Sequence, residues 1–237
     1  MLGLGNSLIK GGLTGPTIVT DNLVLKHKYD AGAVVPVSDG AAYFDGTDDY
    51  IDLGNQATSG DDFTMSAWVY LLDNNINTVL QWGDMLMRMN DDTSFMAWAD
   101  QAGTGSDATV SSGLNKWVHI CAVIDDDAVH HYRNGVFIET DTGLSTLSTD
   151  STGSYIGKYS SHYFKGYICN VGLWSATLTQ AQIKSIMNKN YAGLSTSEKT
   201  NLVSWWNLDV ETNAAGTPGY SGYVGDSHTG NNHGTLS

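Results

Sequence analysis

The stretch that decides the fold is Lys116-Trp-Val-His-Ile-Cys-Ala-Val123, which is followed by Tyr132-Arg-Asn-Gly-Val-Phe-Ile138. Both runs are rich in β-branched and aromatic residues, which favour β-strands. The Asn-Gly pair predicts a tight type I′ turn between strand-like runs, because both central residues of that turn need a positive φ. We expect Tyr132, Asn134 and Val136 to point to one face, and Arg133, Gly135 and Phe137 to the other. This alternation favours a sandwich whose sheets have one buried and one wetter face.

Short apolar runs of the same kind continue on both sides of this stretch. In the clearest of them, Phe63, Met65, Ala67, Val69 and Leu71 alternate with Thr64, Ser66, Trp68 and Tyr70. The chain has 27 glycines and only 3 prolines, so the segments between the runs are predicted to be turns and not disordered linkers. The other predicted strands are residues 41–46, 50–54, 78–83, 85–89, 94–99, 153–157 and 164–174. Regularly spaced strands predict an all-β sandwich or barrel.

One helix is predicted near residues 180–189. Thr179-Gln-Ala-Gln182 has the pattern of a capping box, and Ile183, Ile186 and Met187 form an apolar stripe at helical spacing. We expect this helix to end near Asn190. Ser195-Thr-Ser-Glu198 is a second capping-box pattern and predicts a short helical turn before the apolar run 202–208.

The charge of the chain excludes one class of partner. The formal net charge is -14, and the only glutamates are Glu139, Glu198 and Glu211, so most acidic residues are aspartates, which favour turns. A chain this acidic repels phosphate backbones, so we expect no nucleic-acid partner.

The two cysteines and the first residues bear on the cellular compartment. Cys121 and Cys169 lie in apolar runs and are predicted to be buried core residues, with a disulfide between them as an open alternative. Residues 1–12 lack the pattern of a signal peptide, and no apolar run approaches the roughly 18 residues of a membrane span. We therefore expect synthesis in a cytoplasm and no membrane insertion.

Residues 1–30 differ from the rest and are predicted to be a glycine-rich arm ahead of one domain at 31–237. The arm is either a flexible leader or an anchor that orders against a partner, because Leu2, Leu4, Leu8 and Ile9 are poor choices for a solvated tail. Residues 202–237 are predicted to complete the domain.

Catalysis is not expected. A glycoside hydrolase on a sandwich needs two carboxylates about 5–9 Å apart across a cleft. The pair considered is Glu139 with Asp141, which lies just past the hairpin strand and has the pattern of a polar strand end. The histidines do not have zinc-site spacing, and His119 is predicted to be a core histidine.

Calcium and glycans are the predicted ligands. Calcium prefers carboxylate, amide and carbonyl oxygens, and its candidate ligands are Asp45, Asp48, Asp49, Asp226 and Asn231, with turn capping as the alternative role. Sugar rings stack on aromatic side chains, and polar groups bind their hydroxyls. The candidate glycan-binding residues are Trp98, Tyr159, His162 and Tyr163, whereas Trp68 and Trp82 are expected mainly in the core.

Several segments, taken in order, resemble the laminin-G-like, concanavalin A-like jelly-roll family. They are residues 43–53, 63–69, 117–122, 132–136 and 164–183. The resemblance implies a two-sheet antiparallel jelly-roll sandwich with one or two short peripheral helices. The family's opening strand and its Asp-Ser-x-Gly-Asn loop correspond to residues 206–209 and 225–236, which come last here. The domain is therefore circularly permuted, or pairs this strand with a neighbouring subunit, or carries the remnant of a second repeat.

The leader adds a functional expectation. Residues 1–12 and 23–32 resemble the leaders of tailed-phage virion proteins that carry such jelly rolls. This implies a virion protein that decorates a capsid or belongs to a fibre or tail, forms a homo-oligomer, contacts other virion proteins through residues 1–30 and binds host-surface glycans. The alternatives are a glycan-binding module of a secreted or cell-surface protein, and a divergent glycoside hydrolase.

Overall fold

The computed structural model describes residues 38, 40–57, 60–98, 106–110, 113–143, 152–209, 211–212, 222–229 and 231–237. All of these belong to one compact unit, Val34–Ser237. The arm predicted at residues 1–30 lies outside the described residues, so its role stays a prediction.

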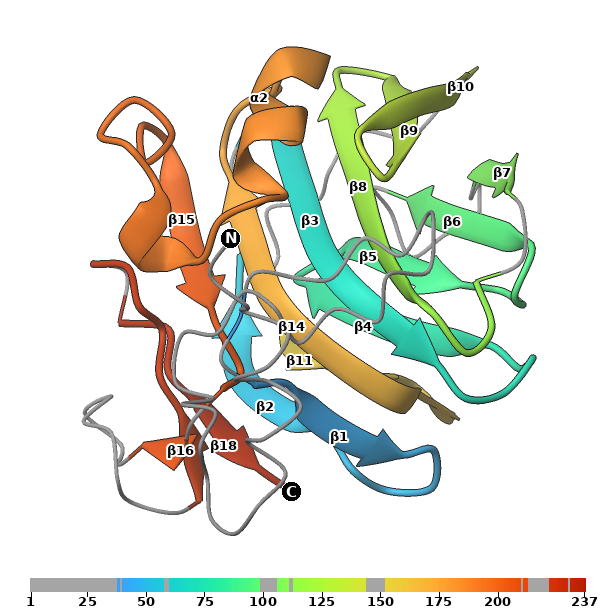
Figure 1. Cartoon of the computed structure of the whole chain (residues 1–237), viewed down its shortest axis with the longest axis vertical. Helices are drawn as coiled ribbons and strands as arrows, with labels where there is room; N and C mark the ends of the chain where they lie inside the picture. The colour runs from blue at the N-terminus through green and yellow to red at the C-terminus, as the bar shows by residue number, and fades with distance from the viewer. Residues whose placement is uncertain are drawn as a thin grey trace, which may run out of the picture. The chain divides into compact units, whose positions relative to one another are not determined.

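The described residues form two large antiparallel sheets and a small two-stranded one (Figure 1). The first sheet has the order β1 (Ala42–Asp45), β14 (Lys165–Trp174), β3 (Asp62–Leu71), β8 (Trp117–Asp125), β9 (Ala128–Arg133) and β10 (Val136–Thr142), and β15 (Leu202–Trp206) also pairs with β14. The second has the order β16 (Glu211–Thr212), β17 (Tyr223–Val224), β18 (Gly234–Leu236), β2 (Ile51–Gln56), β11 (Thr152–Ile156), β4 (Asn77–Trp82), β5 (Met85–Met89), β6 (Ser94–Trp98) and β7 (Ser106–Thr109). A hairpin joins β12 (Lys158–Tyr159) to β13 (His162–Tyr163). The predicted all-β sandwich is confirmed.

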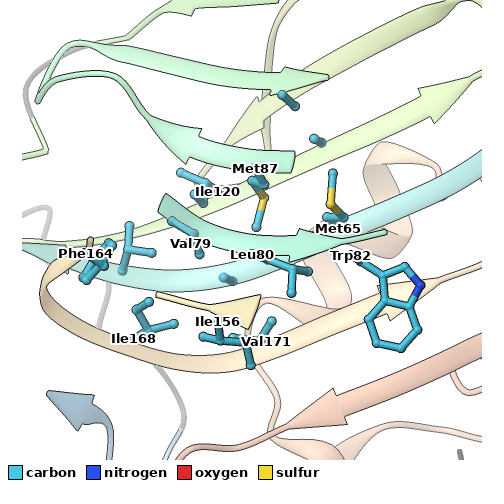
Figure 2. Close-up of a cluster of buried hydrophobic side chains, with 14 of the residues drawn as sticks. Met65, Val79, Leu80, Trp82, Met87, Ile120, Ile156, Phe164, Ile168 and Val171 are labelled. Atoms are coloured by element: carbon cyan, nitrogen blue, oxygen red, sulfur yellow. The ribbon is translucent and has the colours of Figure 1, made fainter. Parts of the chain in front are cut away.

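The main core fills the space between the two sheets (Figure 2). Met65 of β3, Ile120 of β8 and Ile168 of β14 meet Leu80 and Met87 of the second sheet, and all five are buried. The predicted inward face of residues 63–71 is confirmed. Burying each such side chain contributes about 1.5–3 kcal/mol, so this layer dominates the stability of the sandwich.

A second core covers the outer face of the first sheet, so one expectation was wrong. Thr64 and Ser66 are almost fully buried and do not form a wetter face, and Trp68 beside them is buried as expected. The reason is that helix α2 (Gln180–Ile186) packs over this part of the sheet, where Ile183 and Ile186 join a cluster with Cys121, Trp174 and Trp205. In Figure 1, α2 lies at one end of β3 and β14.

The helix α2 begins as predicted and ends early. The Thr179–Gln182 capping box is formed in both directions, and Met187 is the C-cap. The indole Nε1 of Trp68 donates to the Met187 carbonyl oxygen at 2.8 Å, which satisfies a helix-end acceptor that would otherwise lack a partner. Residues 196–200 form turns, and a short 3₁₀ helix lies at Tyr191–Gly193. Among the described helices, none has the length and apolar character that crossing a bilayer would need.

The stretch that decides the fold forms three strands and not two. Asp126, with φ 56°, lies in the turn from β8 to β9, and Asn134 and Gly135, with φ 50° and 71°, form the predicted turn from β9 to β10. Tyr132 pairs with Phe137 in register, and their rings lie 5.6 Å apart, so both point to the same face. The expected alternation across the turn is wrong. The chain reverses at Asn134 and Gly135, so Tyr132 lies opposite Phe137 and Arg133 lies opposite Val136.

The C-terminal residues contribute strands to both sheets within the same chain. β15 pairs with β14, and β18 pairs with β2. Trp206 of β15 packs against Trp82, with ring centroids 6.0 Å apart, and its Nε1 donates to the Asn232 carbonyl. The two cysteines, Cys121 and Cys169, are free and buried, which confirms their predicted place in the core; the alternative disulfide is not formed.

Candidate functional site

Three loops surround a hollow of about 370 Å³ at one end of the sandwich. They are the β1–β2 turn, the β3–β4 loop and the β12–β13 hairpin. We call this feature the loop hollow; its lining residues are Gly46, Asp73, Asn75, Ile76, Ser161, His162 and Tyr163. His162 and Tyr163 were predicted as glycan-binding residues, and Gly46 belongs to the turn of the predicted calcium ligands. The structure thus brings parts of two separate predictions to one place.

The β3–β4 loop supplies an ionised acceptor that the sequence analysis missed. Asp73 accepts hydrogen bonds from the Nδ2 of Asn75 at 2.8 Å and the Nδ2 of Asn77 at 3.0 Å. Burial raises the pKa of Asp73, but the bonds from Asn77 and Asn75, together with the charge of Lys165, outweigh burial and hold this pKa below its usual range. Asn77 Oδ1 also accepts from the Lys165 amide at 2.7 Å, which fixes the loop to β14. A carboxylate held in this way can accept hydrogen bonds from ligand hydroxyls.

The β1–β2 turn brings three carboxylates together. Asp45, Asp48 and Asp49 each offer an oxygen, and these oxygens lie within 4.8 Å of one another. Asp45 Oδ1 accepts hydrogen bonds from the Thr47 and Asp48 amides, and Asp49 Oδ2 accepts one from the Asp45 amide. Asp45 and Asp49 therefore each use one carboxylate oxygen to hold the turn. The bond from Thr47 is the main cause of the lowered pKa of Asp45. Three carboxylates this close suit a hard divalent cation such as Ca²⁺.

The β12–β13 hairpin is held by a lysine among tyrosines. Lys158 Nζ lies 3.9 Å from the ring centroid of Tyr50, 5.1 Å from that of Tyr155 and 5.6 Å from that of Tyr163. Cation–π contacts of this kind contribute roughly 0.5–1 kcal/mol each at exposed sites. They hold Tyr163 at the rim of the loop hollow.

The other predicted glycan residues lie elsewhere. Tyr159 is half-buried on β12, where it pairs with His162, and it does not line the loop hollow. Trp98 ends β6, a strand of the second sheet separated from β11 by β4 and β5, and its side chain lies outside the described residues.

In the second predicted group of calcium ligands, Asp226 binds backbone amides. Asp226 is buried, and its carboxylate accepts from the amides of Trp205 at 3.0 Å, His228 at 2.9 Å and Asn232 at 3.1 Å. These bonds fix the loop after β17 against β15, which favours the turn-capping alternative for Asp226. Asn231 is exposed and adopts φ 55°.

The residues considered for catalysis have ordinary surroundings. Glu139 and Asp141 lie on β10, opposite His131 and Val129 of β9, and Asp141 Oδ2 is 4.0 Å from His131 Nδ1. His119 is confirmed as a core residue: it is 1% exposed, and its Nε2 lies 2.8 Å from Ser66 Oγ. Burial lowers the pKa of His119 to about 3, so its ring is neutral near pH 7.

The sequence of residues 45–184 matches the model of the concanavalin A-like lectin/glucanases superfamily, in its Laminin_G_3 family. Because this match spans more than half of the chain, the protein belongs to that superfamily. No curated protein sequence matches the chain.

Solved structures share the fold. A candidate carbohydrate-binding protein of Bacteroides ovatus ATCC 8483 aligns with a TM-score of 0.62 and 24% identity over 83% of this chain and 57% of that chain. The heptameric SAP-like pentraxin of Limulus polyphemus gives a TM-score of 0.55 and 16% identity over 65% of this chain and 84% of its own. Domain 4 of an extracellular arabinanase from Geobacillus stearothermophilus, solved with arabinotriose, gives a TM-score of 0.50. It shares 22% identity over 62% of this chain and 76% of that domain's chain. The present chain thus spans 57% of the Bacteroides chain.

Proposed function

We propose that the protein is a lectin-like module that binds a neutral glycan at the loop hollow. The observation that carries this proposal is the composition of the hollow. It combines an ionised acceptor, Asp73, an amide, Asn75, and two ring side chains, His162 and Tyr163. Amides and carboxylates bind sugar hydroxyls, and a tyrosine ring packs against the C–H face of a sugar.

The charge of the chain supports a neutral ligand. The formal net charge is -14, and Asp45, Asp48 and Asp49 lie in the turn that supplies Gly46 to the hollow. Acidic sugars would be repelled from this end at low ionic strength. The arabinanase domain solved with arabinotriose and the Bacteroides protein described as a candidate carbohydrate-binding protein are consistent with a sugar ligand for this fold.

We further propose that the module acts without catalysis as part of a virion, as a capsid decoration, fibre or tail component that recognises host-surface glycans. The support is the glycine-rich, apolar leader at residues 1–30, which would bind other virion proteins. Deleting residues 1–30 is the test. The remaining protein should still bind glycan, but it should no longer co-purify with virions or form a homo-oligomer. Release of reducing ends from a polysaccharide would instead support the glycoside hydrolase alternative.

We expect Tyr163→Ala to weaken glycan binding about tenfold, which corresponds to about 1.4 kcal/mol. The variant loses the ring at the rim while Asp73 and Asn75 remain. The measurement is a titration with neutral oligosaccharides that bind the unmodified protein on a glycan array. Phe137→Ala is the control, because Phe137 is also an exposed aromatic (44%) but lies at the β9–β10 turn. If Tyr163→Ala and the unmodified protein bound the glycan with equal affinity, the loop hollow would not be the binding site.

Calcium binding at the β1–β2 turn is a separate prediction. A ligand that binds only the folded state stabilises it, by about 2.7 kcal/mol at a hundredfold excess over Kd, and we expect calcium to raise the melting temperature by several degrees relative to chelator. Asp48→Asn should abolish the rise, whereas Asn231→Ala should retain it. Identical melting curves in calcium and in chelator would show that these carboxylates only cap the turn.

A further inference from the structure

Four aromatic side chains form a row across the outer face of the first sheet. Tyr43 of β1 is in register with Tyr167 of β14, Tyr167 with Tyr70 of β3, and Tyr70 with Trp117 of β8. Successive ring centroids lie 5.2, 6.0 and 5.6 Å apart. We call these four residues the aromatic row. Figure 1 shows the four strands side by side in this order.

The row faces away from the main core. Phe44, Ile168, Val69 and Val118, each adjacent in sequence to one member of the row, point into that core. Side chains alternate along a strand, so the row lies on the opposite face. Tyr43 is 52% and Tyr167 is 38% exposed, and Tyr70 and Trp117 are half-buried.

An exposed aromatic row needs an explanation, because exposed apolar patches on soluble domains mark binding surfaces. On the same face, Trp68 is covered by its contact with the residue that ends α2, whereas Tyr70, two positions along the same strand, remains partly open. Three strand spacings separate Tyr43 from Trp117, a span of about 14 Å. That span is longer than a single sugar ring.

Short stretches of strand connect the row to residues that line the loop hollow. The next side chains along these strands are Asp45 and Lys165, which are in register, and Leu72, whose amide donates to the Lys165 carbonyl at 3.0 Å. Gly46 and Asp73 come one residue later along the chain, and both line the hollow. One step of two residues along a strand is about 6.8 Å, so a single elongated ligand can contact both features.

We propose that the aromatic row binds a second stretch of the glycan held at the loop hollow, so that the ligand is a neutral chain of several sugars and not a single terminal sugar. This inference rests on the proposed function. Tyrosine rings offer an apolar face for sugar C–H groups and a hydroxyl for sugar oxygens. Asp45 and Lys165 border the row with an acceptor and a donor.

The ring geometry and the charge define the occupant further. Neighbouring rings are inclined by 53°, 81° and 67°, so the row is not a flat platform and suits one twisted chain better than a flat crystalline surface. A second copy of this protein would bring two chains of net charge -14 together, which disfavours self-association through this face.

The test compares affinity with ligand length. The probes are disaccharides and hexasaccharides of arabinan, β-glucan, xylan and mannan, titrated into the full chain. In the unmodified protein, the hexasaccharide of the series that binds should bind at least about tenfold more tightly than its disaccharide, a gain of about 1.4 kcal/mol. The double variant Tyr43→Ala/Tyr167→Ala should lose this gain and keep the disaccharide affinity, whereas Tyr163→Ala should weaken both.

The controls separate the two proposals. Val136→Ala/Phe137→Ala removes two exposed apolar side chains elsewhere on the same sheet and should bind like the unmodified protein. Melting temperatures within a few degrees of the unmodified protein would show that each variant is folded. If the affinity did not depend on ligand length, or if the double variant kept the length dependence, the proposal that the aromatic row binds glycan would be wrong. The proposal that the loop hollow binds glycan would be unaffected. Absence of binding to every probe would overturn both proposals. A dimer in sedimentation that the double variant abolishes would identify a second copy as the occupant and would also overturn the inference.

Discussion

Replacing Gly166 with alanine is expected to destabilise the protein by about 3–5 kcal/mol, through steric overlap and backbone strain together. Gly166 lies in β14 with φ +140°, a conformation that residues with a side chain rarely adopt. An added Cβ would overlap the carbonyl oxygen of Tyr70 on the neighbouring strand β3. The clashing atom belongs to the backbone of a paired strand, so it cannot move away as the end of a flexible side chain could. Urea unfolding measures the loss directly.

Gly54→Ala is the matched control. Gly54 also has a positive φ, +75°, but a Cβ there would meet nothing within 4 Å. We expect it to cost only about 1 kcal/mol, the typical penalty of a non-glycine residue in this region. Equal losses in the two variants would show that backbone strain, and not the contact with Tyr70, sets the cost. Because Gly166 separates Lys165 from Tyr167, its conformation also helps to place the aromatic row.

The second large effect is expected at Glu198, which fastens the segment after α2. Its carboxylate accepts from Lys189 Nζ at 2.6 and 2.8 Å, from Ser185 Oγ at 2.6 Å and from the Ser195 amide at 2.7 Å. Burial raises the pKa of Glu198, but the bonds from Lys189, Ser185 and Ser195 outweigh burial and lower it from 4.5 to about 2. A glutamate in the unfolded chain keeps its ordinary pKa, so the stabilisation is present above that value and is lost as the pH falls toward 2.

Glu198→Gln should therefore lower the free energy of unfolding by about 2 kcal/mol at neutral pH, in line with hydrogen bonds to charged groups. Glutamine keeps the size of the side chain and a capping acceptor, so the variant removes mainly the charge opposite Lys189. The difference from the unmodified protein should shrink toward zero between the ordinary pKa of a glutamate and pH 2. Glu139→Gln is the control and should change little at any pH. A difference at Glu198 that stays constant with pH would contradict the charge-based account.

The strands were predictable from the sequence because they are short runs of apolar and aromatic residues bounded by glycine, aspartate and asparagine turns. Residues 63–71, 85–89 and 164–174 were each recognised to within a few residues of their observed limits. The burial of Thr64 and Ser66 was not predicted, since it depends on α2 folding back over the sheet from a distant part of the chain. The alternation of residues along one strand predicts which side chains share a face of the sheet. It does not predict which other element of the chain packs on that face.

The candidate site was predictable only in fragments. Asp45, Asp48 and Asp49 form a local cluster, and His162 and Tyr163 stand in a recognisable loop. Asp73 and Asn75 were missed because only the folded chain brings their loop to the other two. The aromatic row was missed for a related reason: its members come from four strands, and the register between strands distant in sequence cannot be derived from a single strand's pattern.

The pairing of the C-terminal strands has a consequence for how the protein is made. β14 is paired along part of its length with β15, and β2 needs β18, so both sheets remain incomplete until residues 202–236 have left the ribosome. Until then, Trp82 lacks Trp206, and β2 presents an unpaired edge on which other nascent chains can add. Pairings between residues this distant in sequence also form slowly. During synthesis the protein therefore passes through a period in which the edge of β2 is open to aggregation, and that period ends when β18 pairs with β2.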